Sequence, residues 1–156
     1  NNTKSSTLFW AIELQNDAFD NALIKDHLRT HPQLVPLKKI HSTLLFVGKK
    51  SGFGDQETIL KQYEGKKCKL TVDAYGYSEL ALALRVNKMT VLEDGSEEIL
   101  PSYADQQHIT MALSNVVLPN GKKVLPKESV KTLQGEGEIT EFDEEEFQLY
   151  GIVKRY

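Results

Sequence analysis

Cysteine is scarce in this sequence, and long apolar runs are missing from it. Cys68 is the only cysteine, so no intrachain disulfide can form and cysteine-rich zinc modules are excluded. A chain without disulfides fits a reducing compartment, and we therefore expect a nuclear or cytoplasmic protein. No apolar run approaches the roughly 18–20 residues that a membrane-spanning helix needs. We therefore expect no membrane partner.

Several motifs of nucleotide-binding proteins and hydrolases are also missing. There is no Gly-x-x-x-x-Gly-Lys loop, so binding of a nucleoside triphosphate has no support. There is no Gly-x-Ser-x-Gly elbow, so a Ser-His-Asp triad has no support either. The histidines and the cysteine do not supply three or four metal ligands at tight spacing. We therefore expect neither a metal nor another cofactor.

The composition is that of one globular domain, which we place at residues 1–156. Hydrophobic residues make up 40% of the chain and charged residues 26%. Seven acidic residues and no Lys or Arg lie at positions 134–146, so the rest of the chain is net positive. Local basic regions can therefore face a polyanion, although ordinary solvated surface is the plainer interpretation of the lysines. Because the chain starts with Asn rather than Met, we expect a fragment or a processed form.

Short apolar, β-branched and aromatic runs alternate with turn residues and dominate the chain. They predict strands at residues 7–14, 40–47, 69–75, 79–86, 107–113, 138–142 and 147–154. Helical periodicity predicts helices at 16–30, capped by Asn16 or Asp17, and at 57–63 and 127–133. Asp94-Gly95 and Asn120-Gly121 predict turns. Many strands with few helices indicate an α+β fold with mostly antiparallel pairing.

Two of the predicted strands carry the same short motif. The first reads His41-Ser42-Thr43 and the second reads His108-Ile109-Thr110, each followed by apolar residues. Side chains in a strand alternate between the two faces of the sheet, so the His and the Thr of each motif share a face. The apolar residues then point to the opposite face. If the two strands lie side by side, two imidazoles and two hydroxyls converge on one groove.

That set of groups suits cleavage of a phosphodiester at a ribose. An imidazole titrates near pH 6.5, so one ring can act as a base while the other is protonated and acts as an acid. Hydroxyls and an imidazolium are good donors to phosphate oxygens. The other histidines, His27 and His31, lack this context and are interpreted as surface or capping residues. We expect Trp10 in the core and Cys68 in a structural role.

The paired motifs resemble those of the two-histidine phosphoesterase superfamily, whose members carry two His-x-Thr/Ser motifs. The stretch from His108 through Pro126-Lys127-Glu128-Ser129 and the opening strand at 9–14 are similar to the C-terminal cyclic phosphodiesterase domain of fungal tRNA ligases. The resemblance implies a bilobal fold with mostly antiparallel sheets lining a central cleft and flanking helices. One departure is the longer stretch at residues 115–125, which precedes the Lys-Glu-Ser loop.

The resemblance also implies an activity and a partner. The activity is metal-independent hydrolysis of RNA 2′,3′-cyclic phosphate ends to a 3′-hydroxyl and a 2′-phosphate. The partner is an RNA with such an end, a tRNA exon half, met during tRNA splicing. A monomer with kinase and ligase domains upstream is implied for the full-length enzyme. Two alternatives stay open: hydrolysis of 2′–5′ oligoadenylate or RNA 3′ tails, and binding of RNA ends without catalysis.

The expected catalytic residues are the two motif pairs. One imidazole takes a proton from water while the other donates one to the departing ribose oxygen, with His108 preferred as the base and His41 as the acid. We expect Thr43 and Thr110 to bind the phosphate oxygens. Further substrate contacts are expected from side chains near the motifs, each with an ordinary surface position as the alternative: Lys127, Ser129, Lys49 and Tyr103.

Overall fold

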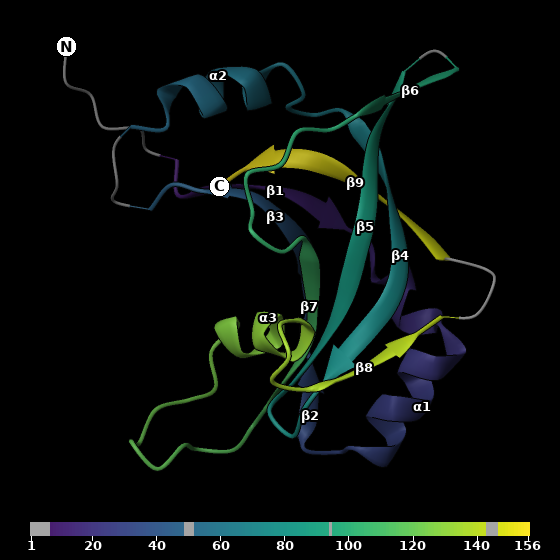
Figure 1. Cartoon of the computed structure of the whole chain (residues 1–156), viewed down its shortest axis with the longest axis vertical. Helices are drawn as coiled ribbons and strands as arrows, with labels where there is room; N and C mark the ends of the chain where they lie inside the picture. The colour runs from purple at the N-terminus through teal and green to yellow at the C-terminus, as the bar shows by residue number, and fades with distance from the viewer. Residues whose placement is uncertain (1–6, 49–51, 94, 143–146) are drawn as a thin grey trace.

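The computed structural model describes residues 7–48, 52–93, 95–142 and 147–156. Their nine strands belong to one sheet, in the order β2-β7-β5-β4-β9-β1-β3, with β6 paired to β5 and β8 paired to β4 (Figure 1). The strands are β1 (Phe9–Leu14), β2 (Leu34–Pro36), β3 (Ile40–Phe46), β4 (Lys67–Tyr77), β5 (Ala81–Glu93), β6 (Ser96–Ile99), β7 (His108–Ser114), β8 (Glu138–Glu141) and β9 (Phe147–Arg155). The helices are the 3₁₀ helix η1 (Asn16–Asp20) and the α-helices α1 (Ala22–Thr30), α2 (Gly54–Lys61) and α3 (Lys127–Leu133).

The sheet curls until its two ends meet. The strands at the ends of the order, β2 and β3, are consecutive in the chain and are joined by residues 37–39. One short connection therefore spans from one end of the sheet to the other, and β3 comes into contact with β7. Helix α3 lies inside the curve against β5, β4 and β7 (Figure 1).

The expected α+β class with antiparallel pairing is confirmed, because every pairing among the described strands is antiparallel. The bilobal arrangement with sheets lining a central cleft was implied by the resemblance. The described strands form one sheet, whose longest strands are β4 with 11 residues and β5 with 13 residues.

The first predicted helix is interrupted at Asn21. This residue has φ −61° and ψ 130°, which ends η1 and starts α1. Its Oδ1 accepts hydrogen bonds from the backbone nitrogens of Leu23 at 2.9 Å and Ile24 at 3.3 Å. Asn21 is therefore the N-cap, and the expectation that Asn16 or Asp17 caps this helix was wrong, because Asn21 satisfies the first free N–H groups of α1.

Two strands were not predicted, and both are short. β2 has three residues and ends in Pro36, which is tolerated because β2 is an edge strand that, among the described strands, pairs with β7 alone. β6 follows the predicted turn, where Gly95 has φ +81°, although Asp94 lies outside the described residues. The Asn120-Gly121 turn is confirmed by the hydrogen bond from the backbone nitrogen of Gly121 to the carbonyl of Leu118.

The core lies between the sheet and its helices and includes the residues expected there. Trp10 is fully buried, and its indole Nε1 donates to Glu57 Oε1 at 3.0 Å. Cys68 is also fully buried, and burial raises the pKa of its thiol to about 12, which makes it a poor nucleophile. Its expected structural role is confirmed. None of the helices among the described residues has the length and apolar character needed to cross a membrane.

Candidate functional site

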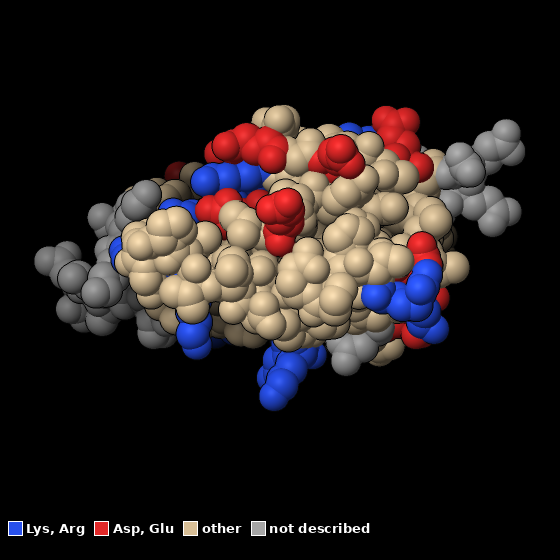
Figure 2. Space-filling model, turned by 90° about the horizontal axis from the view of Figure 1, so that it is seen from below, with Lys and Arg blue, Asp and Glu red and all other residues tan. Residues whose placement is uncertain are grey.

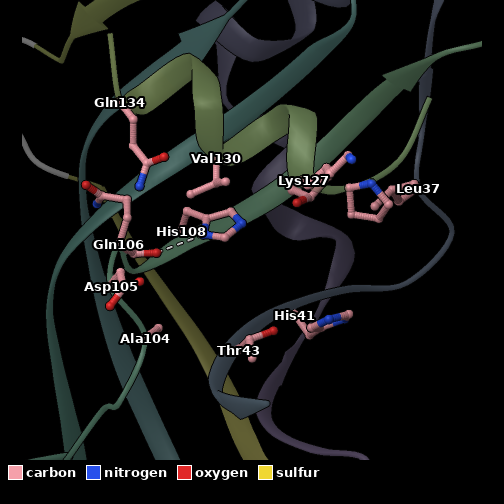
Figure 3. Close-up of a pocket in the computed structure, with 12 residues that line it drawn as sticks. Leu37, His41, Thr43, Ala104, Asp105, Gln106, His108, Lys127, Val130 and Gln134 are labelled. Carbon is pink, nitrogen blue, oxygen red and sulfur yellow. Dashed lines mark hydrogen bonds between the residues drawn. The ribbon is translucent and has the colours of Figure 1, made fainter. Parts of the chain in front are cut away.

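A cavity of about 510 Å³ lies where β3, β7 and α3 meet. Figure 3 shows His41 and Thr43 on one side of it and His108 on the other. The side chains that line it include both predicted motifs and one of the predicted substrate contacts: His41, Thr43, His108, Thr110 and Lys127. The structure therefore brings together residues that are 67 positions apart in the chain, as the two motifs predicted.

The strand alternation that predicts this face is present in both strands. In β3, His41 and Thr43 are half-buried while Ser42 and Leu44 between and after them have no exposed surface. In β7, His108 and Thr110 are half-buried, and the residues that alternate with them are fully buried in the core: Ile109 and Met111. The apolar side chains hold each strand against the core, and the polar side chains face the cavity.

His108 is held in one tautomer. Its Nδ1 lies 2.9 Å from the backbone carbonyl of Gln106, and because a carbonyl only accepts, Nδ1 carries the hydrogen (Figure 3). Nε2 of the neutral ring is then the nitrogen with a free lone pair. Burial lowers the pKa of His108, and the hydrogen bond to Gln106 opposes that shift only in part. His108 therefore has the features of a general base at neutral pH.

His41 differs in its charged surroundings. Burial lowers its pKa, the nearby charge of His108 lowers it further, and the carboxylate of Glu13 raises it. Glu13 lies opposite His41 in the pairing of β1 with β3, and Tyr156 donates a hydrogen bond to its Oε2 at 3.2 Å. Phe9 stacks on the imidazole with ring centroids 5.3 Å apart. Because burial and the charge of His108 outweigh the carboxylate of Glu13, the pKa of His41 is lowered overall and its neutral form is favoured.

Ser129 has a different place from the one expected. It has no exposed surface, and its Oγ donates to the carbonyl of Pro126 at 2.8 Å. The hydroxyl of Thr110 lies 2.5 Å from the same Oγ. The side chain of Ser129 therefore holds Thr110 from behind rather than facing the cavity.

Of the other expected substrate contacts, one lines the cavity and the others do not or lie outside the described residues. Lys127 is the first residue of α3, is exposed, and lines the cavity. Tyr103 is 38% exposed but does not line this cavity, and its backbone nitrogen donates to the carbonyl of Leu44 at 2.8 Å. Lys49 lies outside the described residues.

The site also contains polar residues that the motifs did not indicate. Gln106 and Gln134 line the cavity, and Gln107 lies beside it with hydrogen bonds to the backbone and side chain of β3. The sequence around a glutamine does not show whether it belongs to a site or to solvated surface. For Gln106 and Gln107, the nearby His108 is the one sequence signal of a position in the site. Among the described residues, no group of three or more His, Cys, Asp or Glu side chains is placed to hold a metal ion.

His27 was interpreted as a surface or capping residue, and this was wrong. It is only 7% exposed, and its ring stacks on His31 with centroids 4.0 Å apart. Tyr77 covers it at 4.5 Å. The aromatic neighbours come from β4, which is distant in the chain, so the local sequence did not indicate this burial. His31 is the C-cap residue of α1, so the expectation of a surface or capping position is confirmed for this histidine.

Comparison with known proteins gives a likeness in structure and none in sequence. No family model and no curated protein matches the sequence. A solved structure named fungal RNA kinase superposes on 98% of this chain with a TM-score of 0.62 and 14% sequence identity. The match covers 46% of that protein, so this chain spans less than half its length. At this identity the likeness shows a shared fold.

Proposed function

We propose that this chain is a two-histidine phosphoesterase that hydrolyses RNA 2′,3′-cyclic phosphate ends to a 3′-hydroxyl and a 2′-phosphate without a metal. The observation that carries the proposal is the convergence of His41, Thr43, His108 and Thr110 on one cavity from two distant strands. Two histidines with different surroundings and two hydroxyls match the needs of this reaction, in which one oxygen loses a proton while another gains one.

The geometry suits a single displacement at phosphorus. Nε2 of His108 takes a proton from a water molecule, whose oxygen forms a bond to phosphorus. The bond between phosphorus and the ribose O3′ breaks, and His41 donates its proton to O3′. Thr43 and Thr110 then contact the phosphate oxygens, and the exposed cation of Lys127 stabilises their negative charge. General acid–base catalysis contributes about 10²–10⁴-fold for each group.

Support for the RNA context comes from the structural neighbour. A protein named for RNA kinase activity shares this fold, and more than half of its chain lies outside the match. That arrangement agrees with a phosphodiesterase domain next to a kinase domain, as in the tRNA ligases that the motifs resemble. On this basis we propose a tRNA exon half as the substrate.

Charged side chains are unevenly distributed on one face of the molecule. Seen from below, acidic side chains gather mostly along the upper edge of the face, and basic side chains lie in separate groups at its upper left, its right and its lower edge (Figure 2). The described residues on this face form no continuous basic patch. This face therefore offers no extended basic surface for an RNA backbone.

The decisive experiment is incubation with an RNA oligonucleotide that ends in a cyclic phosphate, in the presence of EDTA. The expected product carries a 2′-phosphate, identified by chromatography against 2′- and 3′-phosphate standards. His41→Ala and His108→Ala should each lose about 10²–10⁴-fold in rate. His31→Ala, which lies outside the cavity, serves as the matched control.

Other outcomes decide between the alternatives. Faster turnover of 2′–5′ oligoadenylate or of RNA 3′ tails would assign the cavity to a different phosphodiester. Tight binding of the cyclic end without turnover would make the chain an RNA-end-binding module. Wild-type rates in both histidine variants would rule out the mechanism.

A further inference from the structure

The two strands that carry the histidines meet without a backbone ladder. Within the described residues, β3 pairs with β1, and β7 pairs with β2 and β5. The contact between β3 and β7 therefore has no regular backbone hydrogen bonds to fix its spacing. The two ends of the sheet are tied by the connection at residues 37–39 and by the backbone hydrogen bond from Tyr103, in the segment before β7, to the carbonyl of Leu44 in β3.

A group of polar side chains bridges this gap. Nε2 of Gln107 donates to Ser42 Oγ at 2.5 Å and to the carbonyl of Thr43 at 2.8 Å. Oε1 of Gln107 accepts from Ser102 Oγ at 2.5 Å. Ser42 Oγ donates in turn to the carbonyl of His108 at 2.9 Å. Both hydrogens of the amide and its oxygen are used, so the orientation of the Gln107 side chain is fixed.

These bonds end on the backbone of the cavity residues themselves. Gln107 immediately precedes His108, and Ser42 lies between His41 and Thr43. The bond from Gln107 reaches the carbonyl of Thr43, and the bond from Ser42 reaches the carbonyl of His108. These hydrogen bonds therefore connect the backbone of the first motif directly to the backbone of the second.

We infer that Gln107, supported by Ser42 and Ser102, is a positioning residue that sets the spacing between the imidazoles of His41 and His108. A displacement of about 1 Å at reacting groups costs on the order of 10²-fold in rate. The importance of this spacing for turnover rests on the proposed function. The spacing itself is a property of the fold and can be measured without a substrate.

The first test measures the interaction between the two rings by NMR titration of their ring protons. In the wild-type background, His108→Ala should raise the pKa of His41, since it removes both a nearby positive charge and part of the burial. In the Gln107→Ala background the rings are further apart, and the same replacement should raise that pKa by less than half as much. An unchanged increment would overturn the inference.

The second test separates positioning from stability. Gln107→Ala and Gln107→Glu should each lower kcat by about 10-fold or more with KM within about 3-fold, because the phosphate contacts remain. The glutamate variant keeps the side-chain length and the partner of Ser102 but loses both donors to β3. If Gln107→Ala fails to fold, the glutamate variant and Ser42→Ala carry both tests.

The matched control is Ser114→Ala, at the far end of β7. Ser114 is 7% exposed, and its Oγ accepts from the backbone nitrogen of Val116 at 3.1 Å. Its replacement removes a part-buried hydrogen bond from the same strand and should leave kcat and the coupling of the histidines unchanged. A loss of kcat in this control equal to that of Gln107→Ala would reduce Gln107 to a stability role.

The two proposals fail separately. If the wild-type protein does not hydrolyse a cyclic phosphate end, the proposed function fails, and the NMR titration alone decides the role of Gln107. If hydrolysis occurs but the Gln107 variants keep both kcat and the coupling, only the positioning role fails.

Discussion

The hydroxyl of Thr110 is not free to donate to a phosphate in the unbound protein. Ser129 has one hydroxyl hydrogen, and it points to the carbonyl of Pro126, which can only accept. The hydrogen bond between Ser129 and Thr110 must then be donated by Thr110. To donate to a substrate oxygen, Thr110 must give up this bond, or Ser129 must turn its hydrogen away from Pro126.

Removing Ser129 should therefore harm stability and spare activity. Ser129→Ala eliminates two buried hydrogen bonds, each of which contributes about 0.5–1.5 kcal/mol. A total loss of about 1–3 kcal/mol lowers Tm by about 2–4 °C per kcal/mol in a protein of this size. The hydroxyl of Thr110 is released towards the substrate, so we expect kcat/KM within about 3-fold of the wild-type value or above it.

Thr110→Val provides the contrast because it keeps the shape and removes the hydroxyl. It loses a hydrogen bond to a charged phosphate, which is worth about 1.5–3 kcal/mol, or about 10- to 150-fold in kcat/KM. Both variants are compared by initial rates on a cyclic-phosphate oligonucleotide and by thermal unfolding. Thr132→Val, which removes another buried hydroxyl of α3, controls for helix stability.

The result that refutes this reasoning is specific. If Ser129→Ala loses as much kcat/KM as Thr110→Val while its melting temperature stays at the wild-type value, then Ser129 contacts the substrate directly.

Three further predictions follow from burial and packing. The lowered pKa values of His41 and His108 place the maximum of kcat/KM below about pH 6.5, and a maximum near pH 8 would contradict this. Burial also lowers the pKa of His27, so at acidic pH the unfolded chain binds a proton that the native state does not bind, and the free energy of unfolding falls as pH drops below about 6.5. Urea unfolding at several pH values should show that this free energy falls less in His27→Phe than in the wild type. Gly151→Ala places a Cβ 2.4 Å from the carbonyl of Glu13 and should cost about 1–3 kcal/mol or more, measured by thermal unfolding.

Local sequence patterns predicted those helices and strands whose structure is determined by residues within the same segment. The alternation in β3 and β7 correctly indicated which face carries His41 and His108, since the period of a strand is set within the strand. Helix α3 was predicted at its observed bounds. The interruption at Asn21 was missed because the helical stripe continues across it, and only the side chain of Asn21 shows where the new helix begins.

Features that depend on distant partners were not predictable in this way. The burial of His27 requires tyrosines from β4, and the role of Gln107 requires β3 to lie beside it. Nothing near either residue indicates those neighbours. The one long-range feature that was predicted, the meeting of the two motifs, came from their repetition rather than from any local property.

The order of the strands has a consequence for synthesis. β9, the last strand in chain order, lies between β4 and β1 and is the link in the sheet between the part with β3 and the part with β7. A nascent chain that has already emerged through both histidines still lacks this strand. Until then, the two parts are connected by residues 37–39, by the backbone hydrogen bond from Tyr103 to Leu44 and by contacts between β3 and β7, so we expect the arrangement of the cavity to become stable only when translation has delivered β9.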